Sequence, residues 1–122
     1  MINYIQLGNT KCIRELIAAG AKVGLKNDEE KTPMHVAAEK GKSNVIRLLA
    51  NHDKNLIFDE DEDSNQALHL AAFSGFVRCV KVLIQNSAPI VSRNSKGWTP
   101  LDCAANEGSV EICTELLDND YG

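Results

Sequence analysis

The sequence has few aromatic residues and few cysteines. Aromatic side chains make up only 5% of the 122 residues, so leucine, isoleucine, valine and alanine must build the core. The four cysteines form no Cys-x-x-Cys pair, which argues against a bound metal and against a disulfide framework. We therefore expect reduced thiols and an intracellular location of the protein, in the cytoplasm.

Excess positive charge and long apolar runs are also missing. Lysine and arginine total 13 against 17 acidic residues, which gives a net charge of -4. A nucleic-acid partner requires a dense cationic surface, so none is expected. No apolar run approaches the roughly 20 residues that span a bilayer, so we expect no membrane insertion. Residues 1–10 lack the basic start and apolar stretch of a signal peptide.

Catalytic motifs are absent as well. The sequence contains no nucleophile elbow, no glycine-rich phosphate loop and no His-Glu-x-x-His motif. Outside the acidic stretches at 28–30 and 59–63 it has no adjacent carboxylates for acid–base chemistry. We therefore predict that the protein is not an enzyme and uses no cofactor.

What the sequence does contain is an internal repeat. Three similar segments recur at a nearly constant spacing: 32–38 (TPMHVAA), 66–72 (QALHLAA) and 99–105 (TPLDCAA). A glycine lies nine residues after the start of each segment. Gly8 precedes the first of these glycines by one repeat length. Apolar residues follow each glycine at offsets of about four, five, eight and nine, which is the spacing of one helix face.

The pattern predicts a pair of helices in each repeat. Threonine caps the start of the first helix and proline fits its first turn. The alanines keep this helix thin, and the glycine ends it because glycine adopts positive φ at little cost. The second helix carries the larger aliphatic residues. A single pair cannot bury its own apolar face, so neighbouring pairs must stack.

These motifs resemble the ankyrin repeat, which has a period of about 33 residues and the signature Thr-Pro-Leu-His-x-Ala. The resemblance covers almost the whole chain and implies an all-α solenoid of stacked helix-turn-helix units with β-hairpin-like loops. It also implies a concave surface of loops and first helices that binds a protein. We divide the chain into a partial repeat at 1–27, repeats at 28–61 and 62–94, and a C-terminal partial repeat at 95–122.

The sequence departs from the family pattern at several places. The first unit has no Thr-Pro start, and neither end has a polar cap, so the chain is interpreted as a segment of a longer array. Asp102 replaces the usual histidine and Gln66-Ala67 replaces Thr-Pro; both changes are expected to loosen local hydrogen bonding. Residues 61–72 and 96–101 also resemble repeats in the cytoplasmic ankyrin arrays of TRPA-type ion channels.

Three groups of polar or reactive residues have a structural and a functional interpretation. The equivalent residues His35 and His69 are expected to bond loop backbone rather than to form a catalytic or metal pair. The cysteines are expected to fill the core, although exposed thiolates would permit redox sensing. The acidic run 59–63 is expected to be a solvated loop tip, with a calcium site or a docking surface for a basic partner as the alternatives.

Two aromatic residues are the strongest candidates for partner binding. Phe73 occupies the position that is polar in the other units (Glu39 and Asn106), so it should be exposed. Trp98 precedes a Thr-Pro start, and it either binds the partner or packs within its own loop. Exposed aromatic residues often dominate the binding energy of an interface. The remaining candidates on this face are Lys31, Glu39, Lys40, Asn65, Ser74, Asn106 and Glu107.

The sequence is consistent with two functions. The first is a protein-binding module, whose partner docks on the loops and first helices. The second is a structural segment of a longer scaffold, whose ends stack on adjacent ankyrin repeats. Exposed Phe73 favours the first function, and the uncapped ends favour the second.

Overall fold

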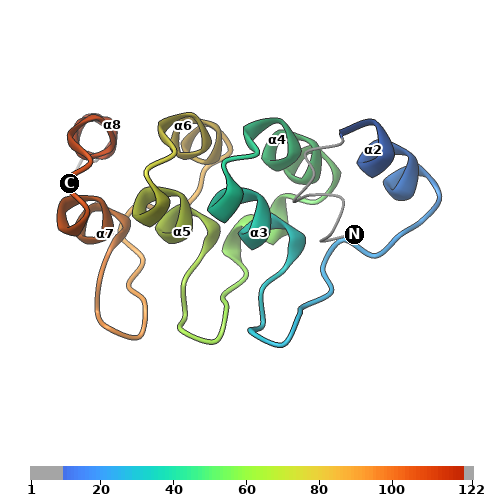
Figure 1. Cartoon of the computed structure of the whole chain (residues 1–122), viewed down its shortest axis with the longest axis horizontal. Coiled ribbons are helices and arrows are strands. Elements are labelled where there is room, and N and C mark those ends of the chain that lie inside the picture. The colour runs from blue at the N-terminus through green and yellow to red at the C-terminus, as the bar shows by residue number, and fades with distance from the viewer. Residues whose placement is uncertain (1–9, 120–122) are drawn as a thin grey trace.

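The computed structural model describes residues 10–119, and within them the chain is a stack of helix pairs without strands. In Figure 1 the helices form two rows, and the loops that precede α3, α5 and α7 project away from both rows. This arrangement confirms the all-α solenoid of stacked helix-turn-helix units. The elements are α2 (Thr10–Ala18), α3 (Pro33–Lys40), α4 (Ser43–His52), the 3-10 helix η1 (Lys54–Phe58), α5 (Ala67–Ser74), α6 (Val77–Gln85), α7 (Pro100–Asn106) and α8 (Val110–Asp118).

The helices α3 and α7 begin at Thr-Pro pairs, as the sequence predicts. The hydroxyl oxygen of Thr32 accepts a hydrogen bond from the amide of His35, and that of Thr99 accepts one from the amide of Asp102. Proline follows in the first helical turn, where no backbone amide is needed. These caps fix where each first helix starts.

The two departures at the helix starts have different consequences. The prediction of looser bonding is wrong at Asp102, because its Oδ2 accepts a hydrogen bond of 2.9 Å from the amide of Thr99. The short carboxylate therefore replaces the histidine ring in this local role. At Gln66 the prediction is correct: the side-chain oxygen Oε1 is buried without a hydrogen-bond partner. The backbone amide of Gln66 still donates to Nδ1 of His69, 3.1 Å away.

Glycine ends two of the first helices. Gly41 and Gly75 have φ values of +74° and +82°, and their amides donate to the carbonyls of Ala37 and Ala71. Gly41 also lies against the ring of Phe76: a β-carbon built on it would be 2.7 Å from that ring. The third unit differs slightly, because α7 ends at Asn106 with Glu107 as its cap, one residue before Gly108.

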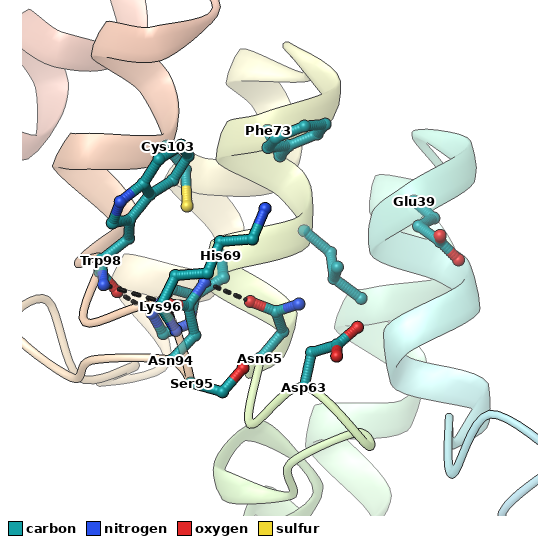
Figure 2. Close-up of a pocket in the computed structure, with 11 residues that line it drawn as sticks. Glu39, Asp63, Asn65, His69, Phe73, Asn94, Ser95, Lys96, Trp98 and Cys103 are labelled. Atoms are coloured by element: carbon teal, nitrogen blue, oxygen red, sulfur yellow. Dashed lines mark hydrogen bonds between the residues drawn. The ribbon is translucent and has the colours of Figure 1, made fainter.

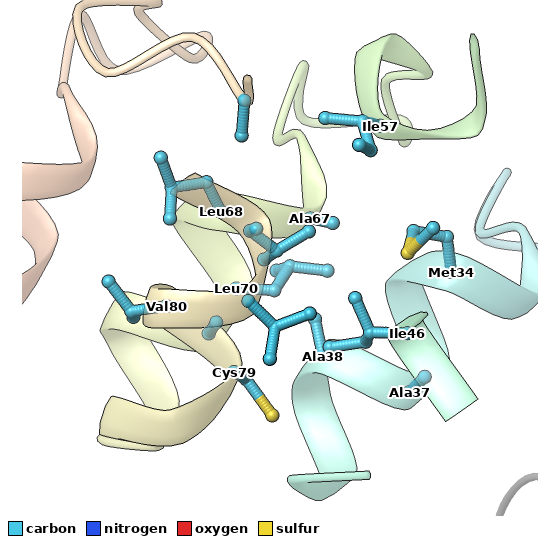
Figure 3. Close-up of a cluster of buried hydrophobic side chains, with 14 of the residues drawn as sticks. Met34, Ala37, Ala38, Ile46, Ile57, Ala67, Leu68, Leu70, Cys79 and Val80 are labelled. Atoms are coloured by element: carbon cyan, nitrogen blue, oxygen red, sulfur yellow. The ribbon is translucent and has the colours of Figure 1, made fainter. Parts of the chain in front are cut away.

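The core lies between successive helix pairs. Figure 3 shows apolar side chains of α3 and α4 facing those of α5 and α6. Ala38 and Ala72 are fully buried on the first helices, where their small size allows neighbouring helices to approach closely. Ile46 and Leu83 supply bulk from the second helices and are also fully buried. The predicted division into thin first helices and aliphatic second helices is therefore confirmed.

Three hairpin-like loops project from the first helices. We call these loops fingers and define them as residues 27–31, 61–65 and 94–98. The first residue of each finger is Asn27, Asp61 or Asn94, and its Oδ1 accepts bonds from the amides two and four residues later. The fourth residue of each finger has φ between 60° and 79°. The fingers therefore share one local geometry.

The acidic run is not simply a solvated loop tip. Asp61 is only 5% exposed, because its carboxylate accepts the two backbone amides that close the second finger. Glu60, Glu62 and Asp63 are exposed, as expected. The prediction is therefore wrong for Asp61, which is a structural residue of the finger.

Candidate functional site

The two repeat histidines connect the first helices to the fingers. His35 Nδ1 accepts the amide of Thr32, so its neutral ring carries the proton on Nε2, which donates to the carbonyl of Asn65 at 2.9 Å. His69 Nε2 lies 2.8 Å from the carbonyl of Ser92 and 3.0 Å from that of Trp98. Burial lowers the pKa of both rings. The predicted structural role of the histidines is therefore confirmed.

A hollow of about 270 Å³ opens between the second and third fingers and the helices behind them. Figure 2 shows Trp98 of the third finger on one side and Glu39 of α3 on the other, with Phe73 of α5 above and Asp63 below. The hollow therefore collects side chains from three successive units. Its lining consists of Glu39, Asp63, Asn65, His69, Leu70, Phe73, Asn94, Ser95, Lys96, Trp98 and Cys103.

The aromatic residues form the apolar part of the hollow. The side chain of Phe73 is accessible, with 48% of the residue exposed, as its unusual position in the repeat predicts. Trp98 is half-buried and packs against the core, and its amide donates to Asn94 Oδ1 within its own finger. The ammonium of Lys96 lies 5.3 Å from the centre of the Trp98 ring. This distance allows a cation–π interaction, so an ammonium of the chain itself already occupies one face of the ring.

Charged and amide side chains surround these rings. Glu39 accepts a 2.8 Å hydrogen bond from the ammonium of Lys31, which also lies 3.5 Å from Glu29. Asn94 Nδ2 donates to Asn65 Oδ1 at 2.8 Å and so connects two fingers. Asp63 is exposed and has no ion pair within the part of the chain described. The rim is therefore ordered by its own contacts and retains one free carboxylate.

The structure brings some of the predicted residues together and leaves others apart. Phe73, Trp98, Glu39 and Asn65 line the hollow, and Lys31 reaches it through its bond with Glu39. The other four predicted residues are exposed but do not line it; they are Lys40, Ser74, Asn106 and Glu107.

Sequence reasoning missed several polar residues of the hollow. Asp63, Ser95 and Lys96 lie in two fingers that are about one repeat apart in sequence, and stacking brings them together. Asn94 carried a usable signal, because Asn27, Asp61 and Asn94 recur with the spacing of the repeat itself. Asparagine or aspartate at that spacing indicates a repeated loop that is closed by its own side chain.

The cysteines are divided between core and surface. Cys79 and Cys103 are buried at 1% and 2% exposure, and burial raises the pKa of each thiol to about 11. These two thiols are therefore protonated near neutral pH and poorly nucleophilic. Cys12 and Cys113 are partly exposed, so the core-filling prediction holds fully for two of the four.

Two further observations concern residues 10–119. They contain no cluster of three or more histidine, cysteine or acidic side chains that could hold a metal ion. Within the same range, each helix is too short or too polar to cross a membrane.

Comparison with known proteins identifies relatives of this stack. A family model described as "Ankyrin repeats (3 copies)" matches residues 1–94 and again 55–122. A Caenorhabditis elegans homolog of transient receptor potential cation channel subfamily A member 1 is 40% identical over 98 residues, which are 80% of this chain and 8% of the relative. The ankyrin repeat protein nuc-2 of Neurospora crassa is 28% identical over 120 residues, or 97% and 11% of the two chains.

The human ankyrin repeat domain-containing protein 13C is 34% identical over 85 residues, which are 70% of this chain and 15% of that protein. The chain therefore spans a small part of each of these relatives. Ankyrin repeats are generally protein-interaction modules rather than catalytic units. With the two rows of helices, the projecting fingers and a family model that matches along its length, the chain belongs to the ankyrin-repeat family.

Proposed function

We propose that this chain binds a protein partner through the fingers and the hollow between them. The observation that carries this proposal is the hollow itself, which combines an exposed phenylalanine, a half-buried tryptophan and a polar rim. An apolar centre within a polar rim is the usual composition of a protein interface. Large aromatic residues in such a centre contribute much of the binding energy.

The charges near the hollow favour a basic partner. Asp63 contributes a free carboxylate, and Glu60 and Glu62 are exposed in or beside the second finger. Acidic groups of this density attract cationic surfaces and accelerate their association.

A matched pair of phenylalanines provides the test. Phe73 and Phe58 are both 48% exposed, but only Phe73 lines the hollow. Three immobilised baits are compared for the proteins they retain from a cell lysate: wild type, Phe73→Ala and Phe58→Ala. The proposal expects a partner that the wild type and Phe58→Ala retain and Phe73→Ala loses. Equal retention by all three baits would refute the role of the hollow.

A specific observation also favours a second function, a segment of a longer ankyrin array. Helix α6 contacts α8, and its residues Val77, Val80 and Ile84 are buried or half-buried. The residues at the same positions of α8 are Val110, Cys113 and Leu117; Val110 is 76% exposed and Leu117 57% exposed. An apolar face that inner units cover with another helix pair fits a further ankyrin repeat. The similarity to a relative named as a TRPA-type cation channel supports such an array, of which the chain would be one part.

Stacking on this face is tested by extending the chain with one ankyrin repeat after α8. The extension should raise the melting temperature and slow hydrogen exchange of the α8 amides, because repeat stability includes the interface with each neighbour. Leu117→Lys should abolish this gain in the extended chain while changing the unextended chain little. An unchanged melting temperature on extension would contradict the array.

We also propose the division into units at 1–27, 28–61, 62–94 and 95–122.

A further inference from the structure

The second helices carry a row of basic residues that the hollow does not use. Arg14, Arg47 and Lys81 each lie six residues after the glycine of their unit, and Lys11 and Arg78 each lie three residues after it. All five are exposed. The row ends at α8, where the equivalent positions hold Glu111 and Thr114. The basic side chains therefore gather over α2, α4 and α6, in the helix row farther from the fingers (Figure 1).

Two shallow hollows lie beneath this row. Arg14 and Arg47 line the first, between α2 and α4, with a volume of about 320 Å³. Lys42 and Arg78 line the second, where α4 approaches α6, with a volume of about 370 Å³. Both hollows are lined by Thr10 and Asn44, so they adjoin one another. We call them together the basic groove. No acidic residue is among those that line it.

The positive charges of the groove are not neutralised within the part of the chain described. Both ion pairs found there belong to Lys31, on the finger side of the molecule. Arg47 makes one hydrogen bond to a neutral group, from Nη1 to Asn44 Oδ1 at 3.4 Å. Like charges that are held together repel one another, and binding an anion relieves that repulsion. The net charge of the chain is -4, so this concentration of cations is a local feature.

We propose that the basic groove binds an extended acidic segment of a partner protein. Arginine presents a planar fork that fits a carboxylate with two parallel hydrogen bonds. A carboxylate side chain can enter the hollows, whereas the flat surface of a membrane would reach only the protruding side chains. Neighbouring helices lie about 8–10 Å apart. An extended segment of polyproline type rises about 3.1 Å per residue, so an acid at every third position matches the groove.

The test uses a fluorescent ten-residue peptide with glutamate at every third position, measured by fluorescence anisotropy. The double variant Arg47→Gln, Arg78→Gln removes two charges from the groove. Its control, Lys22→Gln, Lys54→Gln, removes two exposed charges that do not line it. The proposal expects the groove variant to bind about tenfold more weakly and the control less than about twofold more weakly. Circular dichroism checks that each variant is folded.

Three outcomes would contradict the proposal. An equal loss in both double variants would mean that the peptide senses only net charge. Vesicles of phosphatidylserine provide the other comparison: if the groove variant lost vesicle binding but bound the peptide as the wild type does, the groove would be a membrane contact. A second peptide with its glutamates contiguous at one end should bind the wild type more weakly, and tighter binding of this peptide would refute the proposed spacing.

Discussion

Replacing Gly41 by alanine isolates a single steric contact in the repeat. Gly41 and Gly75 occupy equivalent positions, both have positive φ, and both donate to a helix carbonyl. Only their neighbours differ. A β-carbon at Gly41 would be 2.7 Å from the ring of Phe76, whereas at Gly75 the nearest atom is Oγ of Ser109 at 3.8 Å. Gly75→Ala therefore measures the conformational strain alone, and Gly41→Ala measures strain together with overlap.

The sizes of the two effects follow from these contacts. Left-handed backbone costs an alanine about 1–2 kcal/mol, so Gly75→Ala should lower the free energy of unfolding by about that amount. Overpacking adds about 1–3 kcal/mol, because the ring of Phe76 must leave its place over Gly41. Gly41→Ala should therefore cost about 2–5 kcal/mol.

Urea unfolding followed by circular dichroism measures both variants. A double-mutant cycle with Phe76→Ala completes the test: in that background the two alanine variants should become equal, since the ring is gone. If Gly41→Ala were no more destabilising than Gly75→Ala in the wild-type background, the close packing of Phe76 on Gly41 would be refuted.

Three further predictions follow. Leu83→Ala should lower the free energy of unfolding by about 2–5 kcal/mol because the side chain is fully buried. Leu117→Ala, at a 57% exposed position, should lower it by less than about 1 kcal/mol. Equal urea midpoints of the two variants would contradict the register of α6 and α8. Burial lowers the pKa of His35 and His69 below the ordinary 6.5, so the unfolded chain takes up protons first as the pH falls. The free energy of unfolding should therefore be constant above about pH 6.5 and drop by up to about 1 kcal/mol per histidine near pH 5.5. Unchanged urea midpoints across that range would exclude this linkage. Asn94→Ala should cost about 1–3 kcal/mol and accelerate hydrogen exchange of the Lys96 and Trp98 amides, which it accepts; unchanged exchange would show that the finger does not depend on this side chain.

The fold could be predicted from sequence because local and periodic signals agree. Threonine caps at Thr32 and Thr99 and the glycine at Gly41 determine where helices start and stop, and the regular spacing of the repeats sets their stacking. The exposure of Phe73 was predictable for the same reason, since an aromatic residue stands where other units are polar. Positions that repeat can be compared with one another, and a departure then becomes informative.

The composition of the hollow could not be predicted in the same way. Asp63 and Lys96 line it because two fingers are joined by specific bonds, from the amide of Ser95 to the carbonyl of Asp63 and from Asn94 to Asn65. These bonds depend on the three-dimensional shape of the loops. Burial of Asp61 was hidden for a related reason, because a run of five acids suggests solvent exposure until the turn that its carboxylate closes is seen.

The histidines give the stack a mechanical direction. Each ring starts from its own helix and bonds the finger of the following unit, as His35 does with Asn65 and His69 with Trp98. His69 also lies within hydrogen-bond distance of the carbonyl of Ser92, just before the third finger. Asp102, in the third unit, accepts the backbone amide of Thr99 in its own turn. Force applied along the array would therefore pass from α3 to the second finger and from α5 to the third finger through the histidine hydrogen bonds.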